Sequence, residues 1–127
     1  MKTLSAADIL KRYHEEGLPE FSGIDLIFVN QSGIFGNTPM HIACVRGDID
    51  EVMALINGGA NINAIGEHGN TPLHEAVGQG NNEIIKILVT LGCRVKVKND
   101  FGDTPLDIAK INDRSDIIEL LKLHKIV

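Results

Sequence analysis

The sequence predicts an all-α solenoid made of three helix-turn-helix repeats, with hairpin-like connections and an atypical N-terminal cap. The main observation is a motif that recurs twice at a spacing of 33 residues without a gap. Its copies are residues 36–43 (GNTPMHIA), 69–76 (GNTPLHEA) and 102–109 (GDTPLDIA). A fixed period of this length is typical of stacked repeats, in which each unit buries its apolar face against its neighbours.

The first helix of each repeat is expected to begin at the Thr-Pro pair of the motif. Threonine is a good N-cap because its side-chain oxygen accepts a hydrogen bond from a backbone N–H of the first turn. Proline suits the first helical position, where no backbone N–H is needed. We expect this helix to end near Gly47 in the first repeat and near Gly80 in the second.

The second helix is predicted from apolar residues that lie three or four positions apart and recur with the same period. These residues are Val52, Ile85 and Ile118, followed by Leu55, Leu88 and Leu121. In the first repeat, Asp48 and Glu51 have the spacing of a capping box, in which two side chains satisfy each other's backbone N–H groups. Gly59 and Gly92 suit the left-handed conformation that ends a helix.

The connections between repeats are predicted to be hairpin-like, because residues 62–69 and 95–102 alternate around a turn residue. Gly33, Gly66 and Asn99 are also 33 residues apart, and all three tolerate a positive φ angle. The same turn is therefore expected in each connection.

The repeated unit resembles the ankyrin repeat. The pattern of that family is G-x-T-P-L-H-x-A-A-x-x-G-H, an outer helix similar to E-V-V-K-L-L, and then G-A-D-V-N. The second copy fits best, with residues 83–88 (EIIKIL) as the outer helix and residues 92–95 (GCRV) after it. The resemblance covers about residues 34–124.

Two kinds of position depart from the ankyrin pattern. The aspartate that the family usually has at the hairpin turn is replaced by Gly33, Gly66 and Asn99. The third copy has Asp107 for the motif histidine and Asp113 for the glycine between the helices. Such changes are expected of a terminal repeat that faces solvent.

The N-terminal segment does not follow the period. Ser5 is expected to open a helix that runs through Glu16 and is ended by Gly17 and Pro19, and its candidate packing residues are Leu4, Leu10 and Tyr13. Residues 24–29 (IDLIFV) are apolar but too short to be assigned as strand or helix. We therefore expect one domain, with a helical cap at 1–33 and repeats at 34–66, 67–99 and 100–127.

Composition excludes several classes of function. Apolar residues make up 43% and charged residues 23% of the 127 residues, which is typical of a globular protein. No segment is strongly basic, so nucleic-acid binding is not expected, and the net charge of −5 favours a basic partner. No apolar run is long enough for a membrane helix, and residues 1–5 do not start a secretory signal. Cys44 and Cys93 lack disulfide or zinc spacing, which favours the cytoplasm.

The residues that could carry chemistry have structural interpretations. His41 and His74 occupy one motif position, and the resemblance implies that they bond locally and between repeats. Cys44 and Cys93 stand where the family has small apolar residues, so we expect them in the core. Residues 78–80 (GQG) lack the lysine of a phosphate loop, and the acidic residues of the third copy lack calcium-loop spacing. We expect no enzyme activity, no cofactor and no metal.

The resemblance implies a partner-binding surface on the hairpin tips and on the exposed face of the first helices. One repeat at a time, its residues are Ile34, Phe35, Asn37, Val45 and Arg46; Glu67, His68, Asn70, Gly78 and Gln79; and Asp100, Phe101, Asp103, Ile111 and Asn112. Two phenylalanines at tips are of interest because aromatic side chains dominate interface energies. Phe35 could equally pack against its neighbouring hairpin, whereas Phe101 is better suited to a partner.

The sequence therefore predicts a protein–protein interaction module that binds a partner protein through its concave face and hairpin tips. Within that class, a compact acidic binder could be an immunity or antitoxin-like inhibitor of a basic toxin enzyme. A different class, a small ligand-binding or enzymatic protein on a repeat scaffold, is supported by none of the motifs.

Overall fold

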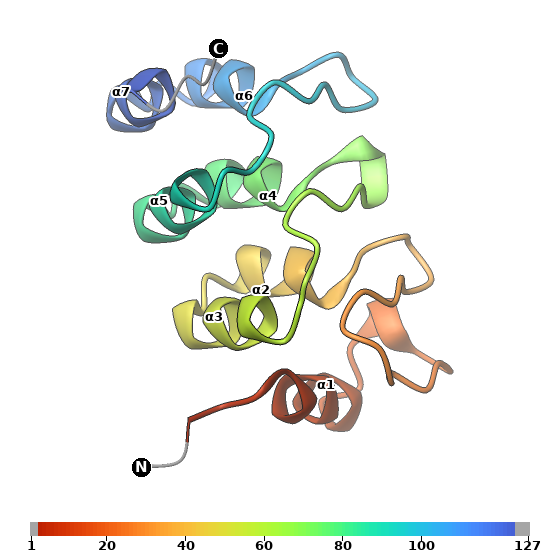
Figure 1. Cartoon of the computed structure of the whole chain (residues 1–127). Helices are drawn as coiled ribbons and strands as arrows, with labels where there is room; N and C mark the ends of the chain where they lie inside the picture. Colours follow the sequence, from red (N-terminus) through yellow and green to blue (C-terminus); the bar gives the residue numbers. More distant parts are fainter. Residues whose placement is uncertain (1–2, 124–127) are drawn as a thin grey trace.

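The structure, a computed structural model, describes residues 3–123 and is all-α in that range. The helices are α1 (Ala6–Glu15), η1 (Pro19–Phe21), α2 (Pro39–Arg46), α3 (Ile49–Asn57), η2 (Glu67–Gly69), α4 (Pro72–Gln79), α5 (Asn82–Thr90), α6 (Pro105–Ile111) and α7 (Ser115–Leu123). Helices α2, α4 and α6 stack in one layer and α3, α5 and α7 in a second, while the connecting loops project on the side of the first layer (Figure 1). The predicted solenoid is confirmed.

The first helices begin and end where the motif predicts. Thr38, Thr71 and Thr104 are the N-caps of α2, α4 and α6, and proline follows each of them. Gly47 and Gly80 end α2 and α4 in the left-handed conformation, each with a φ of 71°.

The second helices confirm the apolar stripe but correct one cap. Val52, Leu55 and their equivalents in α5 are fully buried. Asp48 caps α3, and its carboxylate accepts a hydrogen bond from the Glu51 N–H at 3.1 Å. The predicted capping box is wrong in its second half, because the Glu51 carboxylate is buried against α1 rather than bonded to the Asp48 N–H.

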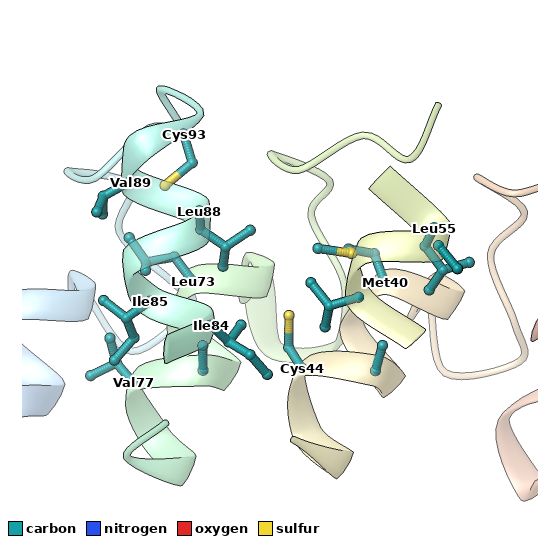
Figure 2. Packing of buried hydrophobic residues seen from close by; sticks show 14 of the residues in the cluster. Met40, Cys44, Leu55, Leu73, Val77, Ile84, Ile85, Leu88, Val89 and Cys93 are labelled. Carbon is teal, nitrogen blue, oxygen red and sulfur yellow. The ribbon is translucent and has the colours of Figure 1, made fainter. Parts of the chain in front are cut away.

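The core runs through the stack as one continuous cluster. Figure 2 shows its middle part, where Met40 and Cys44 of α2 and Leu55 of α3 lie on one side and the side chains of α4 and α5 on the other. Cys44 and Cys93 are free and buried, as predicted. Burial raises the pKa of both thiols, that of Cys93 to about 11.

The connections form three hairpin-shaped turns, which we call hairpin 1 (33–37), hairpin 2 (66–70) and hairpin 3 (99–103). Each is closed by a backbone hydrogen bond from its first residue to the carbonyl of its last, at 2.8, 2.8 and 2.9 Å. No strand is assigned to the hairpins in the described part of the chain, so they are hairpin-like in the turn alone.

The same turn recurs in each connection, as predicted, but its first residue does not use the positive φ that glycine and asparagine tolerate. A left-handed glycine lies three positions later in every hairpin, at Gly36, Gly69 and Gly102, and hairpin 2 has a second left-handed residue at His68. Gly33 and Gly66 are required for a different reason, which is close packing. A Cβ at Gly33 would lie 2.5 Å from Glu20 Oε2, and one at Gly66 would lie 2.5 Å from Asn37 Oδ1.

The N-terminal cap consists of α1, η1 and a long loop. Helix α1 begins at the predicted N-cap Ser5, ends one residue before Glu16, and packs against α3. Leu10 and Tyr13 are buried and Leu4 is partly buried, as expected. From Glu15 to Thr38 the chain takes 23 steps, against 14 steps from Asn57 to Thr71 and from Thr90 to Thr104.

The additional length of the cap is irregular structure. It contains residues 24–29, which form neither strand nor helix, and Ile27 and Phe28 there are 66% and 69% exposed. Among residues 3–123 there is no helix long and apolar enough to cross a membrane.

Candidate partner-binding surface

The tips of the three hairpins carry an aromatic ring at one equivalent position. Phe35, His68 and Phe101 are 33 residues apart, and all three are exposed. We call these three residues the tip column. The rings of His68 and Phe101 are in contact, with centroids 5.7 Å apart and planes tilted by 44°.

Backbone N–H groups join each hairpin to the element before it. At the position preceding the tip ring, the N–H is bonded in every repeat. The three bonds run from Ile34 N to the Glu20 carbonyl at 2.8 Å, from Glu67 N to Asn37 Oδ1 at 3.0 Å, and from Asp100 N to the His68 carbonyl at 2.9 Å. Hydrogen bonds therefore join hairpin 1 to the cap, hairpin 2 to hairpin 1 and hairpin 3 to hairpin 2, so the backbones of the three tips are held side by side.

Hairpin 3 supplies its own turn acceptor. Asn99 Oδ1 accepts hydrogen bonds from the N–H groups of Phe101 and Asp103, both at 3.0 Å. The Asn99 amide nitrogen donates to Asn70 Oδ1 at 3.0 Å, which adds a link to hairpin 2. An amide or carboxylate at the first hairpin position thus organises the turn from within.

Hairpin 1 lacks that acceptor, because Gly33 has no side chain. Glu20 of the cap takes its place: Oε2 accepts from the N–H groups of Phe35 at 2.8 Å and Asn37 at 3.4 Å. Oε1 accepts from the Asn37 amide at 2.7 Å, and Glu20 is buried. The sequence shows only that Gly33 brings no side-chain acceptor of its own, and no local pattern points to Glu20.

Hairpin 2 has glycine at its first position, like hairpin 1, and it is joined to hairpin 3 through the backbone of His68. His68 is left-handed, with a φ of 60°, a conformation that is sparsely populated by residues with a Cβ. The carbonyl of His68 accepts the hydrogen bond from the Asp100 N–H, and its ring lies against Phe101.

The exposed face of the first helices forms the other half of the predicted surface. Val45 is 39% and Ile111 69% exposed, while Gly78 at the middle position adds no side chain. Val45, Arg46 and Gln79 line one open hollow of about 530 Å³ beside the ends of α2 and α4.

Most of the predicted partner-binding residues are exposed, but three are not. Asn70 and Asp103 are half-buried and Asn37 is buried. Asn37 is occupied by Glu20 on one side and by the Glu67 N–H on the other. Its side chain therefore positions two hairpins rather than facing solvent.

A protein-family model described as ankyrin repeats, three copies, matches residues 5–99. The chain belongs to the ankyrin repeat family. No curated protein sequence matches the chain at a significant level. The matched residues include α1 and the first two 33-residue copies, and the division into units at 34, 67 and 100 stays a prediction from the period.

The motif histidines of these ankyrin repeats are structural, as predicted. Nδ1 accepts a hydrogen bond from the N–H of Thr38 at 3.1 Å in His41, and from that of Thr71 at 3.0 Å in His74. Nε2 lies 3.0 and 2.9 Å from backbone carbonyls of the next repeat. Because a carbonyl can only accept, the proton is on Nε2 and each ring is neutral. Burial lowers the pKa of both imidazoles.

Arg46 is tied to the cap of the ankyrin stack. It forms ion pairs with Glu16 and with the buried Glu51, and its guanidinium lies 5.1 Å from the centre of the Tyr13 ring. The hydrogen bond to Glu16 raises the pKa of Arg46. Its charge is thus already paired within the chain.

The described residues contain no group of three or more histidine, cysteine, aspartate or glutamate side chains arranged to hold a metal ion. The hairpin tips therefore present rings, aliphatic side chains and carboxylates to solvent.

Proposed function

We propose that this ankyrin repeat protein binds a partner protein through its hairpin tips and the exposed face of its first helices. Ankyrin repeats are in general protein–protein interaction modules. The observation that carries the proposal is the set of three hairpins joined by hydrogen bonds, each of which carries an exposed ring at its tip. Ordering the residues of an interface costs conformational entropy on binding, and a surface that is already ordered avoids that cost.

The electrostatics of the surface support a basic partner. Glu67 and Asp100 are exposed next to the rings of hairpins 2 and 3, and Asp103 is half-buried beside them. Within residues 3–123, neither Asp100 nor Asp103 forms an ion pair. Complementary charge on a partner would accelerate association and orient it.

Affinity capture with the purified chain tests this function. Phe101→Ala removes an exposed ring, and a joint Asp100→Lys, Asp103→Lys variant reverses the charge of hairpin 3. Both are expected to reduce partner recovery without changing the helical circular dichroism. Met53→Ala, on the exposed side of α3, is the matched control and should capture normally. Equal recovery by all variants would place the binding surface elsewhere.

A finer form of the proposal is that binding inhibits a basic enzyme, as an immunity or antitoxin-like protein would. The uncompensated carboxylates of hairpin 3 support it. If the captured partner is an enzyme, its activity should fall on titration with the wild-type chain and less with the charge-reversed variant. Undiminished activity of the saturated partner would contradict inhibition and leave binding intact.

We propose no catalytic role and a location in the cytoplasm. His41 and His74 have both ring nitrogens bonded, and the pKa of each thiol is raised by burial, so these groups are withdrawn from nucleophilic chemistry. Two free cysteines suit a reducing compartment.

A further inference from the structure

The connection between the second and third repeats carries a row of basic side chains. Arg94, Lys96 and Lys98 are exposed at alternate positions, while Val95 and Val97 between them are partly buried. The equivalent positions of the preceding connection, 33 residues earlier, hold two asparagines and an isoleucine. Within residues 3–123 none of the three basic side chains forms an ion pair. An acidic chain thus carries one local surface of the opposite charge.

An apolar hollow of about 340 Å³ opens beside this basic row. Leu106 in it is only partly buried, whereas Met40 and Leu73, at the same position of the first two repeats, are fully buried where the first helices stack. Such a hollow, with lysines among its lining residues, suits an apolar side chain that has an acidic neighbour. The residues that line it are Val95, Lys96, Thr104, Leu106, Leu121 and Lys122.

The cap contains a loop of this chemistry at residues 25–31, which we call the cap loop. Its Ile27 and Phe28 side chains, the loop pair, are 66% and 69% exposed. Gln31 closes the loop: Oε1 accepts hydrogen bonds from the N–H groups of Ile27 at 2.9 Å and Phe28 at 3.2 Å, and the amide nitrogen donates to the Asp25 carbonyl at 2.8 Å. The loop pair is therefore presented by an ordered turn, which lowers the entropic cost of binding through it.

The cap loop is also fastened to the stack beneath it. Leu26 and Val29 pack against the core. The Asn30 side chain donates to the Gly59 carbonyl at 3.1 Å and accepts from the Asn61 N–H at 2.7 Å. Turning the loop pair inward would break these contacts, so its two large apolar side chains remain available to another surface.

The cap loop matches the hollow in charge as well as in hydrophobicity. Asp25, two residues before the loop pair, is exposed and forms no ion pair within residues 3–123. Hairpin 3 also combines an exposed ring with carboxylates, but the ring of Phe101 is already in contact with His68. The cap loop lies at the end of the stack that holds α1, and the hollow lies on α6 and α7 at the other end (Figure 1). The two surfaces can therefore meet only between two copies of the chain.

We infer that copies of this chain associate, with the cap loop of one copy seated in the apolar hollow of another. The loop pair enters the hollow, and the Asp25 carboxylate faces Lys96 and Lys122 at its edge. This inference goes beyond the proposed function and does not use the tip column. A contact made through one loop buries less than the roughly 1,200 Å² of a stable interface, so the Kd should be in the range of about 10–100 µM.

Sedimentation velocity of the purified full chain, from about 5 to 500 µM, tests the association. The mean mass should rise with concentration. An Ile27→Ser, Phe28→Ser chain, the loop variant, should associate about tenfold more weakly or less well still. A Lys96→Glu, Lys122→Glu chain, the hollow variant, should be weakened to a similar degree because its carboxylates repel Asp25.

Mixing the two variants tests the specific pairing. The loop variant keeps an intact hollow and the hollow variant keeps an intact loop, so together they should form pairs that stop at two chains. A fluorescein label on the hollow variant makes these pairs visible in sedimentation. Adding Asp25→Lys to the hollow variant should restore its self-association, because the two charges are then exchanged.

Two matched controls separate this interface from the binding surface at the hairpin tips. Phe101→Ala in the tip column and the exposed Leu91→Ala at the end of α5 should both associate as the wild type does. Circular dichroism of every variant checks that the fold is kept.

Three results would overturn the inference. The first is a chain that stays monomeric up to about 500 µM, and the second is association that persists unchanged in the loop variant. The third is a monomeric chain whose hollow variant fails to capture a foreign protein, since the hollow would then bind that protein instead. None of these results affects the proposed function, which is judged by the capture of a partner by wild type and not by Phe101→Ala.

Discussion

The junction between the cap and the first repeat contrasts with the junction between the second and third repeats. One equivalent position of the second helices makes the contrast clear. It is Glu51 in α3, Ile84 in α5 and Ile117 in α7, and all three side chains are fully buried. Glu51 meets Arg12, Tyr13 and Arg46, whereas the isoleucines belong to the apolar core. The same place in the repeat is thus filled by a charge at the cap and by hydrocarbon further along.

The difference is instructive about how each junction is specified. Hydrocarbon packs against any apolar neighbour of suitable shape, so repeats of this kind are stacked by a general rule. A buried carboxylate is stabilised only by correctly placed donors, and here they come from α1 and from Arg46. The Tyr13 hydroxyl donates to Glu51 at 2.7 Å. Burial is the larger cause of the raised pKa of Tyr13, and this hydrogen bond is the second. Such directional contacts fix the register of the cap.

The largest effect should come from removing the charge at this junction. Glu51→Ala leaves the Tyr13 hydroxyl and two guanidinium groups without their shared acceptor, and we expect a loss of about 3 kcal/mol in the free energy of unfolding. The value lies at the low end of the range for buried ion pairs because Arg12 and Arg46 are about one third exposed. Urea denaturation measures it.

Glu51→Ile is the informative companion, because it gives α3 the residue that α5 and α7 have. It should also destabilise, since Arg12, Tyr13 and Arg46 would keep polar groups that hydrocarbon cannot satisfy. Wild-type stability in Glu51→Ile would mean that the charged cluster contributes nothing to the cap junction.

A smaller loss of stability is expected from removing Glu20, the residue of the cap whose carboxylate accepts hydrogen bonds from hairpin 1. Glu20→Ala removes the partner of two backbone N–H groups and the Asn37 amide, at a cost of about 2 kcal/mol. Glu20→Gln keeps one oxygen and should lose less. Asn99→Ala is the matched change at hairpin 3 and should cost a similar amount.

Chemical denaturation of the three variants, with the exposed Glu83→Ala as the reference, provides the comparison. Should Glu20→Ala cost no more than Glu83→Ala, the cap would not be supporting hairpin 1.

The smallest effect is a pH dependence of the free energy of unfolding, which we expect from the two histidines that lie between repeats. His41 and His74 have lowered pKa values in the folded state, so the unfolded chain binds more protons when the pH falls below about 6.5. Stability from the neutral rings is complete above that pH and decreases as the pH falls toward the folded pKa. Between pH 7 and pH 6 the loss is below about 1 kcal/mol for each histidine.

Urea midpoints at pH 7 and pH 6, for wild type and for His41→Gln and His74→Gln, would measure the dependence. Asp107 takes the histidine position in the third repeat, and its bond to the Thr104 N–H holds the pKa of that carboxyl below its usual range. Its capping box should therefore be unaffected over this interval. A double glutamine variant with the full wild-type pH dependence would contradict the role of the two rings.

The sequence predicted the structure well wherever one repeat could be compared with another. The period placed the Thr38, Thr71 and Thr104 caps, the apolar stripe and the ends of the helices in the first two repeats, because these features depend on residues close in the chain. The tip residues came from the family resemblance, and the exposure of Phe35 and Phe101 is compatible with it.

The cap could not be read in this way. Glu51 has the spacing of a capping residue, but its partners Arg12 and Tyr13 are 39 and 38 positions away, and no local pattern reports them. Glu20 likewise reaches hairpin 1 from a segment without a repeat to compare it with. The burial of Asn37 follows from its contact with Glu20, so it could not be predicted from the sequence either.

The glycine at the start of hairpin 1 limits how the array could have grown. Gly33 leaves room for Glu20, and a side chain there would displace the cap, so a new unit placed directly after the cap would have to carry both the glycine and a partner for the carboxylate. A unit placed before hairpin 3 meets a turn that carries its own acceptor in Asn99. A unit inserted directly after the cap therefore meets a requirement for glycine and a carboxylate partner that the turn of hairpin 3 does not impose.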